Sequence, residues 1–346
     1  MDHEIRAVAY GSTRRLILEP VVDLHVHYYT DDYVSAILSA DTIKTYRRGD
    51  GRLVAKWISG VALTVVDPHP GPAERVEMMD ELGIETQVLS VPSPNAYFLA
   101  PEPAEQLARN VNHQFAEISR GHPGRFESLA MLPLHDVDRS LGVLEYSLHE
   151  LGQKGAMILS NVNGTPLDDP GFEPFWEAAN DMDLLVYVHP TVPDAPHHDE
   201  NALAIAVGFF SETTLLVARL AYSGVFERYP RIRWVFSHLG GTLPLVLTRL
   251  DSYWRQFEDC RERAPKPPTV YARNLVFDTA SKHGPAVQCA IDTLGMDRLV
   301  FGSDYPHVPG GTGPYLEALQ PFVASSAQRS DVLAGRARRL LSGERI

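Results

Sequence analysis

Apolar residues along this chain gather in short runs, and most runs are followed by a longer stretch of helical character. Most of the runs are nearly continuous in Val, Ile, Leu and Phe, which is typical of strands covered on both faces. Strands that alternate with helices in this way indicate βα units around a parallel sheet. The eight runs span residues 21–27, 86–91, 126–134, 155–161, 184–189, 232–238, 275–279 and 298–304.

Helix signals fill the stretches between these runs. Residues 74–82 end at Gly83, a common helix stop, and the segment 103–120 begins with a proline in its first turn. Further helices are predicted at residues 139–152, 172–180, 214–227, 242–261, 285–294 and from 314 into the C-terminal LAGRARRLL. Eight strands, each followed by a helix, predict an α/β fold with one (β/α)8 TIM barrel domain over residues 1–346.

The longest stretch without a clear period covers residues 30–71, directly after the first strand. We expect it to be an insertion of less regular structure, as are residues 1–20, 191–202 and 265–268. The insertion carries Arg47, Arg48 and Lys56. These cations favour a segment that covers the substrate, but a surface excursion without function accounts for it equally well.

Composition narrows the class of protein. The apolar fraction of 44% and the charged fraction of 22% are typical of a soluble globular chain. A formal net charge of −13 without any long basic run disfavours a nucleic-acid partner. The two cysteines, Cys260 and Cys289, are far apart, which excludes a disulfide framework and suits a reducing compartment. Neither a signal peptide nor a membrane span is visible, so we expect a cytoplasmic protein without a membrane partner.

Side chains that ligate metals occur at the carboxyl ends of four predicted strands, where barrel enzymes build their sites. His25 and His27 share one strand, and because side chains alternate along a strand they point to the same side. His189, His238 and Asp304 end three further strands. A single histidine at a strand end is usually structural, but five groups in register indicate one site at the mouth of the barrel.

These groups suit a divalent metal, because imidazole and carboxylate are suitable ligands for zinc and related ions. We expect His25, His27, His189 and Asp304 to hold the metal, with zinc favoured and manganese or cobalt as alternatives. His238 then remains unligated as the acid/base partner, and Asp304 shares the handling of the proton. This chemistry requires no organic cofactor.

Other candidates are weaker. His283 and His307 lie just beyond the ends of strands seven and eight and are candidates for substrate contact or for support of the site. Asp278 ends strand seven and is either a hydrogen-bond partner that orients a ligand or a structural group. The remaining histidines, His69 among them, are expected to be surface or capping residues. No GxSxG elbow and no GxxxxGK[ST] loop is present, so serine-hydrolase and nucleotide-phosphate chemistry have no support.

Together these residues resemble the amidohydrolase superfamily. The closest branch in appearance is the amidohydrolase-related, or family 2, group of the aminocarboxymuconate semialdehyde decarboxylase type. The likeness covers nearly the whole chain and rests on HVH, GFEPFWEAANDMDLLVYVHP, YPRIRWVFSHLGGTLP, NLVFDTASKHG and DRLVFGSDYP. It implies the same four metal ligands and the same unligated His238. Strand four ends in AMILSN, without the lysine of binuclear relatives, so a single metal is expected.

The resemblance also implies substrate-binding arginines. Arg249 occupies the place of a family arginine that reaches the neighbouring subunit's site in a homodimer, although an ion pair on the helix surface is equally compatible with it. A second family arginine, which binds the substrate carboxylate from the early insertion, corresponds to Arg47 or Arg48. The chain reads HLGG where the decarboxylase reads HGGG, which puts the particular substrate in question.

The leading hypothesis is a non-oxidative carboxy-lyase that acts on an aromatic, dienoic or similarly conjugated acid, with a proton delivered by His238 and Asp304. The alternative is a hydrolase or hydratase that uses a metal-bound water on a lactone, an amide or a double bond. A third hypothesis is a non-catalytic barrel with a structural metal. Either enzyme would act on a small acidic molecule.

Overall fold

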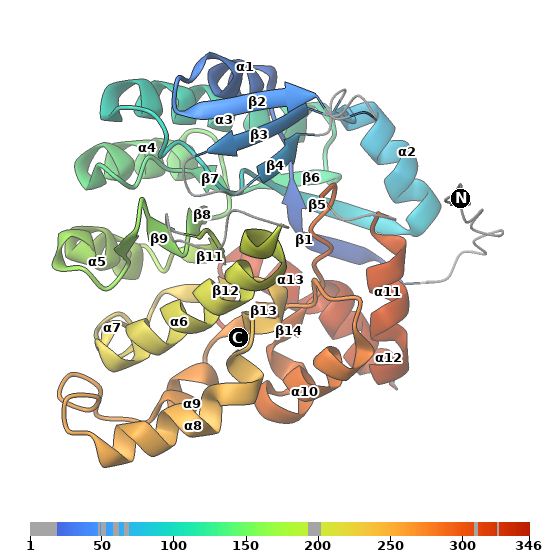
Figure 1. The fold of residues 1–346 in the computed structure, drawn as a ribbon. Coiled ribbons are helices and arrows are strands. Elements are labelled where there is room, and N and C mark those ends of the chain that lie inside the picture. Colours follow the sequence, from blue (N-terminus) through green and yellow to red (C-terminus); the bar gives the residue numbers. More distant parts are fainter. Residues whose placement is uncertain are drawn as a thin grey trace, which may run out of the picture.

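The computed structural model describes residues 19–47, 49, 53–57, 62–65, 69–192, 202–307, 311–323 and 325–346. Its centre is a set of short parallel strands surrounded by helices (Figure 1). One sheet has the order β1-β5-β6, and another has the order β14-β13-β12-β11-β8-β7. These strands are β1 (Val21–His27), β5 (Ile84–Ser90), β6 (Phe126–Ser128), β7 (Ala130–Met131), β8 (Ala156–Leu159), β11 (Leu185–His189), β12 (Arg233–Phe236), β13 (Val276–Asp278) and β14 (Leu299–Val300).

Backbone hydrogen bonds join the two sheets into a closed ring. Only Leu129 separates β6 from β7, and its N–H donates to the carbonyl of Leu89 in β5 at 3.0 Å. At the other seam, Leu24 in β1 donates to the carbonyl of Phe301 at 3.1 Å, directly after β14. Counting β6 and β7 as one interrupted strand, eight strands close the barrel. The predicted TIM barrel is therefore confirmed.

Apolar side chains fill the interior of this ring. One buried cluster takes residues from every barrel strand, as expected when inward-facing positions of all strands meet at the axis. Residues of the last helix join this cluster, so that the C-terminal segment closes the end of the barrel opposite the strand carboxyl ends. The cluster contains Val22, Leu24, Val88, Leu129, Met157, Leu185, Tyr187, Val235, Val276, Val300, Ala334, Ala337 and Leu340.

Helices cover the outside of the ring, close to their predicted places. The predicted helix 214–227 begins earlier than expected and is divided at Gly224, whose φ of 76° ends the helix. The predicted helix 242–261 ends five residues early, and the C-terminal one is broken into pieces. The helices are α2 (Pro72–Leu82), α3 (Pro101–Gly121), α4 (Val137–His149), α5 (Glu173–Asp181), α6 (Phe209–Tyr222), α7 (Val225–Arg228), α8 (Leu243–Gln256), α9 (Pro268–Ala272), α10 (Gly284–Leu294), α11 (Gly313–Leu319), α12 (Ser326–Ser330) and α13 (Arg336–Ser342).

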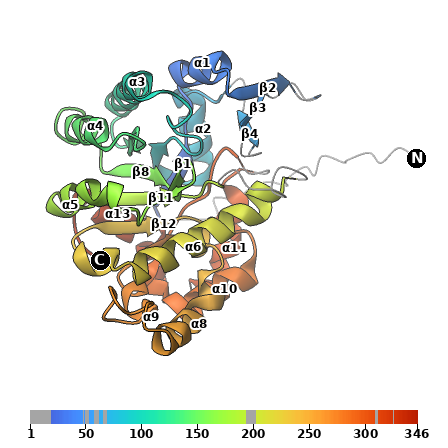
Figure 2. The same cartoon turned by 60° about the vertical axis from the view of Figure 1, so that its left-hand side comes forward.

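The insertion after β1 is more regular than predicted. It contains α1 (Asp31–Ser39) and an antiparallel sheet of β2 (Ile43–Arg47), β3 (Leu53–Trp57) and β4 (Ala62–Val65). The alternation of polar and apolar residues in these strands is too short to stand out from loop sequence. Figure 2 shows the small sheet projecting beyond α1, on the same side of the molecule as the first turns of α6. A short hairpin, β9 (Asn161–Val162) with β10 (Thr165–Pro166), follows β8.

One helical stretch in the described part of the chain, Ala204–Tyr222, is long and apolar enough to cross a membrane by length and composition alone. In the structure this stretch contributes to the outer wall of the barrel, where α6 packs against α7, α8 and α9. A helix of a barrel wall passes the same test of length and hydropathy, so the finding is weak evidence for a membrane span.

Candidate metal centre

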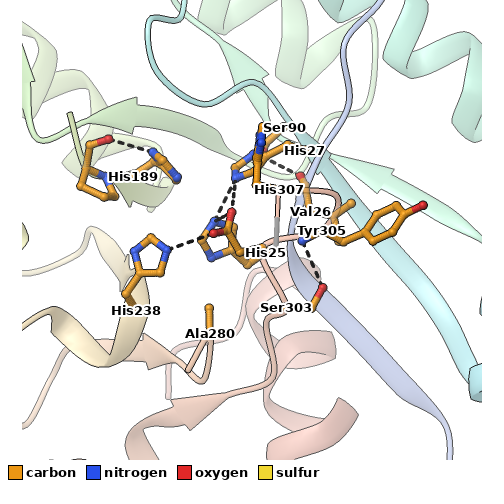
Figure 3. Close-up of polar contacts among 12 residues, drawn as sticks. His25, Val26, His27, Ser90, His189, His238, Ala280, Ser303, Tyr305 and His307 are labelled. Atoms are coloured by element: carbon orange, nitrogen blue, oxygen red, sulfur yellow. Dashed lines mark hydrogen bonds and ion pairs between the residues drawn. The ribbon is translucent and has the colours of Figure 1, made fainter. Parts of the chain in front are cut away.

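Four of the predicted residues meet at the carboxyl ends of the strands, and Figure 3 shows the three histidines among them turned toward one another. His25 and His27 come from β1, His189 ends β11, and Asp304 follows β14. Each offers one ligand atom, and these atoms lie within 4.8 Å of one another. His25 and His27 are fully buried, and His189 is 3% exposed. The geometry is what the strand-end argument predicted, while the role of these residues as ligands stays a prediction.

Hydrogen bonds fix the tautomers of the two histidines on β1. The Nδ1 of His25 lies 2.8 Å from Oδ2 of Asp278, which can only accept when ionised, so Nδ1 carries the proton. The Nδ1 of His27 lies 3.2 Å from Oγ of Ser90, whose own hydroxyl proton goes to the carbonyl of Val26 at 2.8 Å. Nδ1 of His27 is therefore also the donor, and in both neutral rings Nε2 keeps a free lone pair.

His189 obeys the same rule. Its Nδ1 donates to the carbonyl of Pro190 at 2.9 Å, which leaves Nε2 as the free nitrogen. Meanwhile Nε2 of His25 and Nε2 of His27 are only 3.1 Å apart. Two lone pairs at this distance repel unless a proton or a cation lies between them. Three such nitrogens and one carboxylate thus form a donor set that suits a divalent metal.

Burial and the neighbouring charges shift the pKa of each group in this centre, and these shifts decide which group holds a proton when no cation is bound. Burial alone lowers the pKa of His25, but the carboxylates of Asp278 and Asp304 outweigh burial and raise it. Burial lowers the pKa of His27 to about 3. Burial would raise the pKa of Asp304, but the neighbouring His25 charge and the hydrogen bonds from His238 and His27 hold it well below its usual range. A proton would therefore compete with the predicted metal ion for His25.

Asp278, at the end of β13, supports both halves of the site. Its Oδ2 accepts from Nδ1 of His25 and from the hydroxyl of Tyr187. Its Oδ1 accepts the backbone N–H of His238 at 2.8 Å and that of Ala280 at 2.9 Å. Burial acts to raise the pKa of Asp278, but its interactions with His25 hold the value below the ordinary one. Of the two roles considered for this residue, the structure favours the one that orients a ligand.

Asp304 divides its two oxygens between different neighbours. Oδ1 lies 3.0 Å from Nε2 of His27, and Oδ2 lies 3.4 Å from Nε2 of His238. The backbone φ of Asp304 is 60°, a conformation that non-glycine residues seldom adopt and that often marks functional sites. Just before it, Ser303 donates its N–H and its hydroxyl to the buried carboxylate of Asp23, at 3.0 and 2.6 Å. This anchor holds the turn that presents Asp304.

His238 stands beside the four clustered residues and reaches them through Asp304. It begins a tight turn of four consecutive residues with positive φ, from 54° at His238 to 69° at Gly241. A Cβ on Gly241 would lie 2.2 Å from the carbonyl oxygen of Phe210, so this position requires glycine. Leu239 accepts a left-handed conformation (φ 57°), which shows that the HLGG sequence still forms the turn. The ring of Phe210 lies 5.7 Å from the imidazole of His238.

The two weaker histidine candidates have different outcomes. His307 lies at the site, with its ring 5.2 Å from that of His27 and its Nε2 2.5 Å from the hydroxyl of Tyr29. His283 is an exposed residue at the N-cap of α10. Its contacts with other described residues are made by its backbone, so the structure does not bring its side chain to the cluster.

The structure describes two of the three predicted arginines, Arg47 and Arg249, and both side chains are exposed. Arg249 is exposed on α8, where its guanidinium donates to the hydroxyl of Tyr253 at 2.8 Å and lies 5.0 Å above that ring. Its partner among the described residues is therefore an aromatic hydroxyl and ring rather than a carboxylate. Arg47 ends β2 with an exposed side chain. Arg48 lies outside the described residues, and the predicted roles of these arginines in substrate binding stay predictions.

Sequence reasoning missed several groups around the centre. Ser90 ends β5, so the strand-end rule covers it, but a serine carries no metal-ligand signal. Tyr187 precedes His189 by two residues and shares its side of β11. His69 was expected at the surface, yet its Nε2 accepts from Arg75 at 2.8 Å and from the N–H of Tyr29 at 3.3 Å. That expectation is wrong, because the insertion folds back onto the barrel.

Comparison with known proteins agrees with this geometry. The chain is 29% identical over 271 residues to 2-amino-3-carboxymuconate-6-semialdehyde decarboxylase of Dictyostelium discoideum, covering 77% of this chain and 75% of the relative. It is 32% identical over 247 residues to gamma-resorcylate decarboxylase of a Polaromonas species, covering 67% and 76%. These relatives confirm the predicted enzyme class, a carboxy-lyase.

A solved structure gives the same picture. Dihydroxybenzoic acid decarboxylase of a Polaromonas species, crystallised with manganese and the inhibitor 2-nitroresorcinol, superposes with a TM-score of 0.77 at 25% identity. The superposition covers 94% of this chain and 97% of that one. The family model described as amidohydrolase matches residues 22–343, which include all five strand-end residues of the predicted site. The predicted resemblance is thereby confirmed, and the chain belongs to the amidohydrolase family.

Proposed function

We propose that this chain is a metal-dependent, non-oxidative decarboxylase of an aromatic or similarly conjugated carboxylic acid. The observation that carries the proposal is the convergence of three imidazole Nε2 lone pairs and the Asp304 carboxylate, with His238 on the second oxygen of that carboxylate. The named relatives, which decarboxylate resorcylate, dihydroxybenzoate or a carboxymuconate semialdehyde, support the reaction type. A hydroxylated aromatic acid is therefore the first substrate class to test.

The donor set fits one divalent ion held by His25, His27, His189 and Asp304. Three neutral nitrogens and one carboxylate suit zinc, manganese or cobalt, and the manganese of the Polaromonas structure makes manganese a strong candidate beside the predicted zinc. When bound, such an ion supplies a Lewis acid that polarises a substrate oxygen. The proposed ligands come from β1, from the turn after the neighbouring β14, and from the end of β11.

His238 supplies the proton. Its backbone N–H is held by Asp278, and its Nε2 faces Oδ2 of Asp304, so a proton on this nitrogen lies beside a carboxylate that stays ionised. In the reaction His238 gives this proton to the carbon that bears the carboxylate. The bond from that carbon to the carboxylate then breaks, its electrons restore the conjugated system, and carbon dioxide leaves. Atoms and electrons balance without an oxidant or a reductant.

The reaction type is tested by NMR in deuterated water. Metal-loaded protein is incubated with carboxylated phenols, anthranilates, muconates and lactones. A decarboxylase releases carbon dioxide and places deuterium at the vacated carbon. Products that gain water while keeping the carboxylate would instead establish the alternative hydrolase or hydratase.

The role of His238 is tested in the same assay. We expect His238→Ala to lose at least about a hundredfold in kcat, the range of a general acid, at unchanged metal content. His149→Ala, an exposed helix residue, is the matched control and should keep full activity. Full activity of His238→Ala with metal bound would contradict the proposed role.

We also propose a homodimer that uses one face of α8. Leu245 is 73% exposed, and Arg249 and Tyr253 follow at intervals of four, which places these three on one exposed stripe of α8; the exposed Phe257 directly follows the helix. The rings of Tyr253 and Phe257 are stacked at an interplanar angle of 11°. Light scattering should give twice the 38.4 kDa chain mass, and Leu245→Glu should give monomers. A monomeric wild type would refute the dimer.

A further inference from the structure

Arg75 is the most unusual charged group outside the cluster of ligands. Its side chain is completely buried, yet its hydrogen bonds in the described part of the chain all go to neutral groups and none to a carboxylate. It also lies in the first turn of α2, where the partial positive charge of the helix terminus disfavours a cation. Burying a cation without an anionic partner costs free energy, so we look for a role of Arg75 that an apolar residue would not fill.

Every polar partner of Arg75 is neutral. Its Nη2 donates to the backbone carbonyl of His27 at 2.7 Å and to Nε2 of His69 at 2.8 Å. Its Nε donates to the carbonyl of Pro70 at 3.2 Å, and its Nη1 to Oε1 of Gln87 at 3.4 Å. The N–H groups of the planar guanidinium point in fixed directions that match these acceptors, whereas the ammonium group of a lysine has no such planar arrangement.

Aromatic rings complete the environment. The guanidinium carbon lies 4.9 Å from the ring centre of Tyr28 and 4.9 Å from that of Tyr305, so it makes cation–π contacts with both rings. Tyr28 follows His27, and Tyr305 follows Asp304. The side chain therefore touches both segments that close the barrel, each at the residue next to a predicted ligand. Burial lowers the pKa of Arg75 only to about 10, so the cation persists at neutral pH.

We propose that Arg75 is a positioning residue of the metal centre, which sets the spacing of His27 and Asp304 by clamping the end of β1, Tyr305 and the end of the insertion together. The inference rests on the proposed metal site. The backbone itself supports it, because the N–H of His27 donates to the carbonyl of Tyr305 at 2.8 Å, so a shift of either segment moves the other. His69, held by the same guanidinium, extends this clamp into the insertion.

The test measures binding of Mn²⁺ to the full chain, by electron paramagnetic resonance of the free ion. Wild type and His25→Ala come first. If wild type binds no Mn²⁺, or His25→Ala binds as tightly as wild type, the proposed metal centre itself fails. The variants are Arg75→Lys, which keeps the charge, and Arg75→Met, which keeps the bulk.

The matched control is Arg336→Met, because Arg336 is a 3% exposed arginine that supports the opposite end of β14 through the carbonyl of Leu299. All variants are compared by thermal melting of the metal-free protein. Both Arg75 variants should raise the Mn²⁺ Kd at least about tenfold, as loss of an outer-shell partner does. Arg336→Met should lower the melting temperature and leave Kd within about twofold.

The proposal is overturned if Arg75→Lys binds Mn²⁺ with a Kd within about twofold of wild type, since charge alone would then suffice. It is equally overturned if both Arg75 variants lose only thermal stability, as the control does. Should Arg75→Met fail to fold, the Arg75→Lys result decides alone. In each of these cases a wild type that binds Mn²⁺ leaves the proposed metal centre standing.

Discussion

Replacing Asp278 with asparagine turns its Oδ2, which accepts two hydrogen bonds, into an NH2 group, which donates. The asparagine oxygen can still accept the N–H groups of His238 and Ala280, which now use Oδ1. Its NH2 group, however, then faces Nδ1 of His25 and the hydroxyl of Tyr187 in place of Oδ2. Nδ1–H of His25 would point at another donor, so the ring must move its proton to Nε2 or rotate.

Either response removes the Nε2 lone pair of His25 from the metal position. Loss of an outer-shell partner of this kind costs about 10- to 100-fold in metal affinity, or about 1.4 to 2.7 kcal/mol. We therefore expect Asp278→Asn to bind Mn²⁺ and Zn²⁺ with a Kd raised by that factor. Folding stability should fall as well, by roughly 1 to 3 kcal/mol, because the buried hydroxyl of Tyr187 loses its acceptor and the His25 ring must rearrange.

The control for this variant is Asp251→Asn. Asp251 is also a buried carboxylate, and it accepts the N–H and the hydroxyl of Thr269 at 3.0 and 2.6 Å, between α8 and α9. Its replacement should lower stability without changing metal affinity. Competition with a metal-sensitive dye gives Kd, and urea unfolding gives stability. An Asp278→Asn protein that binds metal as tightly as wild type would refute the tautomer argument.

Three further predictions follow from the same contacts. Gly302→Ala should destabilise the protein and reduce its metal content, because the new Cβ would lie 2.7 Å from the Cβ of His25. The control Gly313→Ala should be neutral, because its Cβ would meet no atom within 4 Å. Equal melting temperatures of the two variants would contradict the prediction. Burial lowers the pKa of His69 to about 2, below the unfolded value of about 6.5, so only the unfolded chain gains this proton as the pH falls below about 6.5. Stability should therefore drop on acidification, and less so in His69→Gln; parallel pH profiles of melting temperature would argue against it. Chelation with EDTA should abolish decarboxylation and lower the melting temperature, and Mn²⁺ or Zn²⁺ should restore both.

The barrel and the cluster of predicted ligands were accessible from sequence for physical reasons. A parallel strand buried on both faces must be apolar nearly throughout, so a polar residue at its end is conspicuous. His25 and His27 are two residues apart on one strand, and the period of two places both on one side. The end of the helix at Gly83 is a local property, and the φ of 74° at this glycine agrees with it.

The insertion shows where these rules stop. Its strands are four or five residues long and, among the residues that the structure describes, pair with one another and with no barrel strand. Their hydrophobic period therefore covers too few positions to be distinguished from a loop. Their place above the barrel depends on contacts between segments distant in sequence. Arg75 looks like any charged residue of a surface helix, and only the folded chain reveals that it lies beneath Tyr28 and Tyr305.

Within the site, too, the sequence does not show which distant residues contact each histidine. The sequence identifies groups able to bind a metal, but each histidine has two nitrogens, and only its hydrogen-bond partner decides which one is free. For His25 that partner is 253 residues away, and for His27 it is 63 residues away. Asp304 is a further case, since one oxygen faces the ligands and the other faces His238. Because that carboxylate contacts both groups, the proposed metal binding and the proposed proton transfer would be coupled through a single side chain, whose turn is anchored by the hydrogen bonds from Ser303 to Asp23.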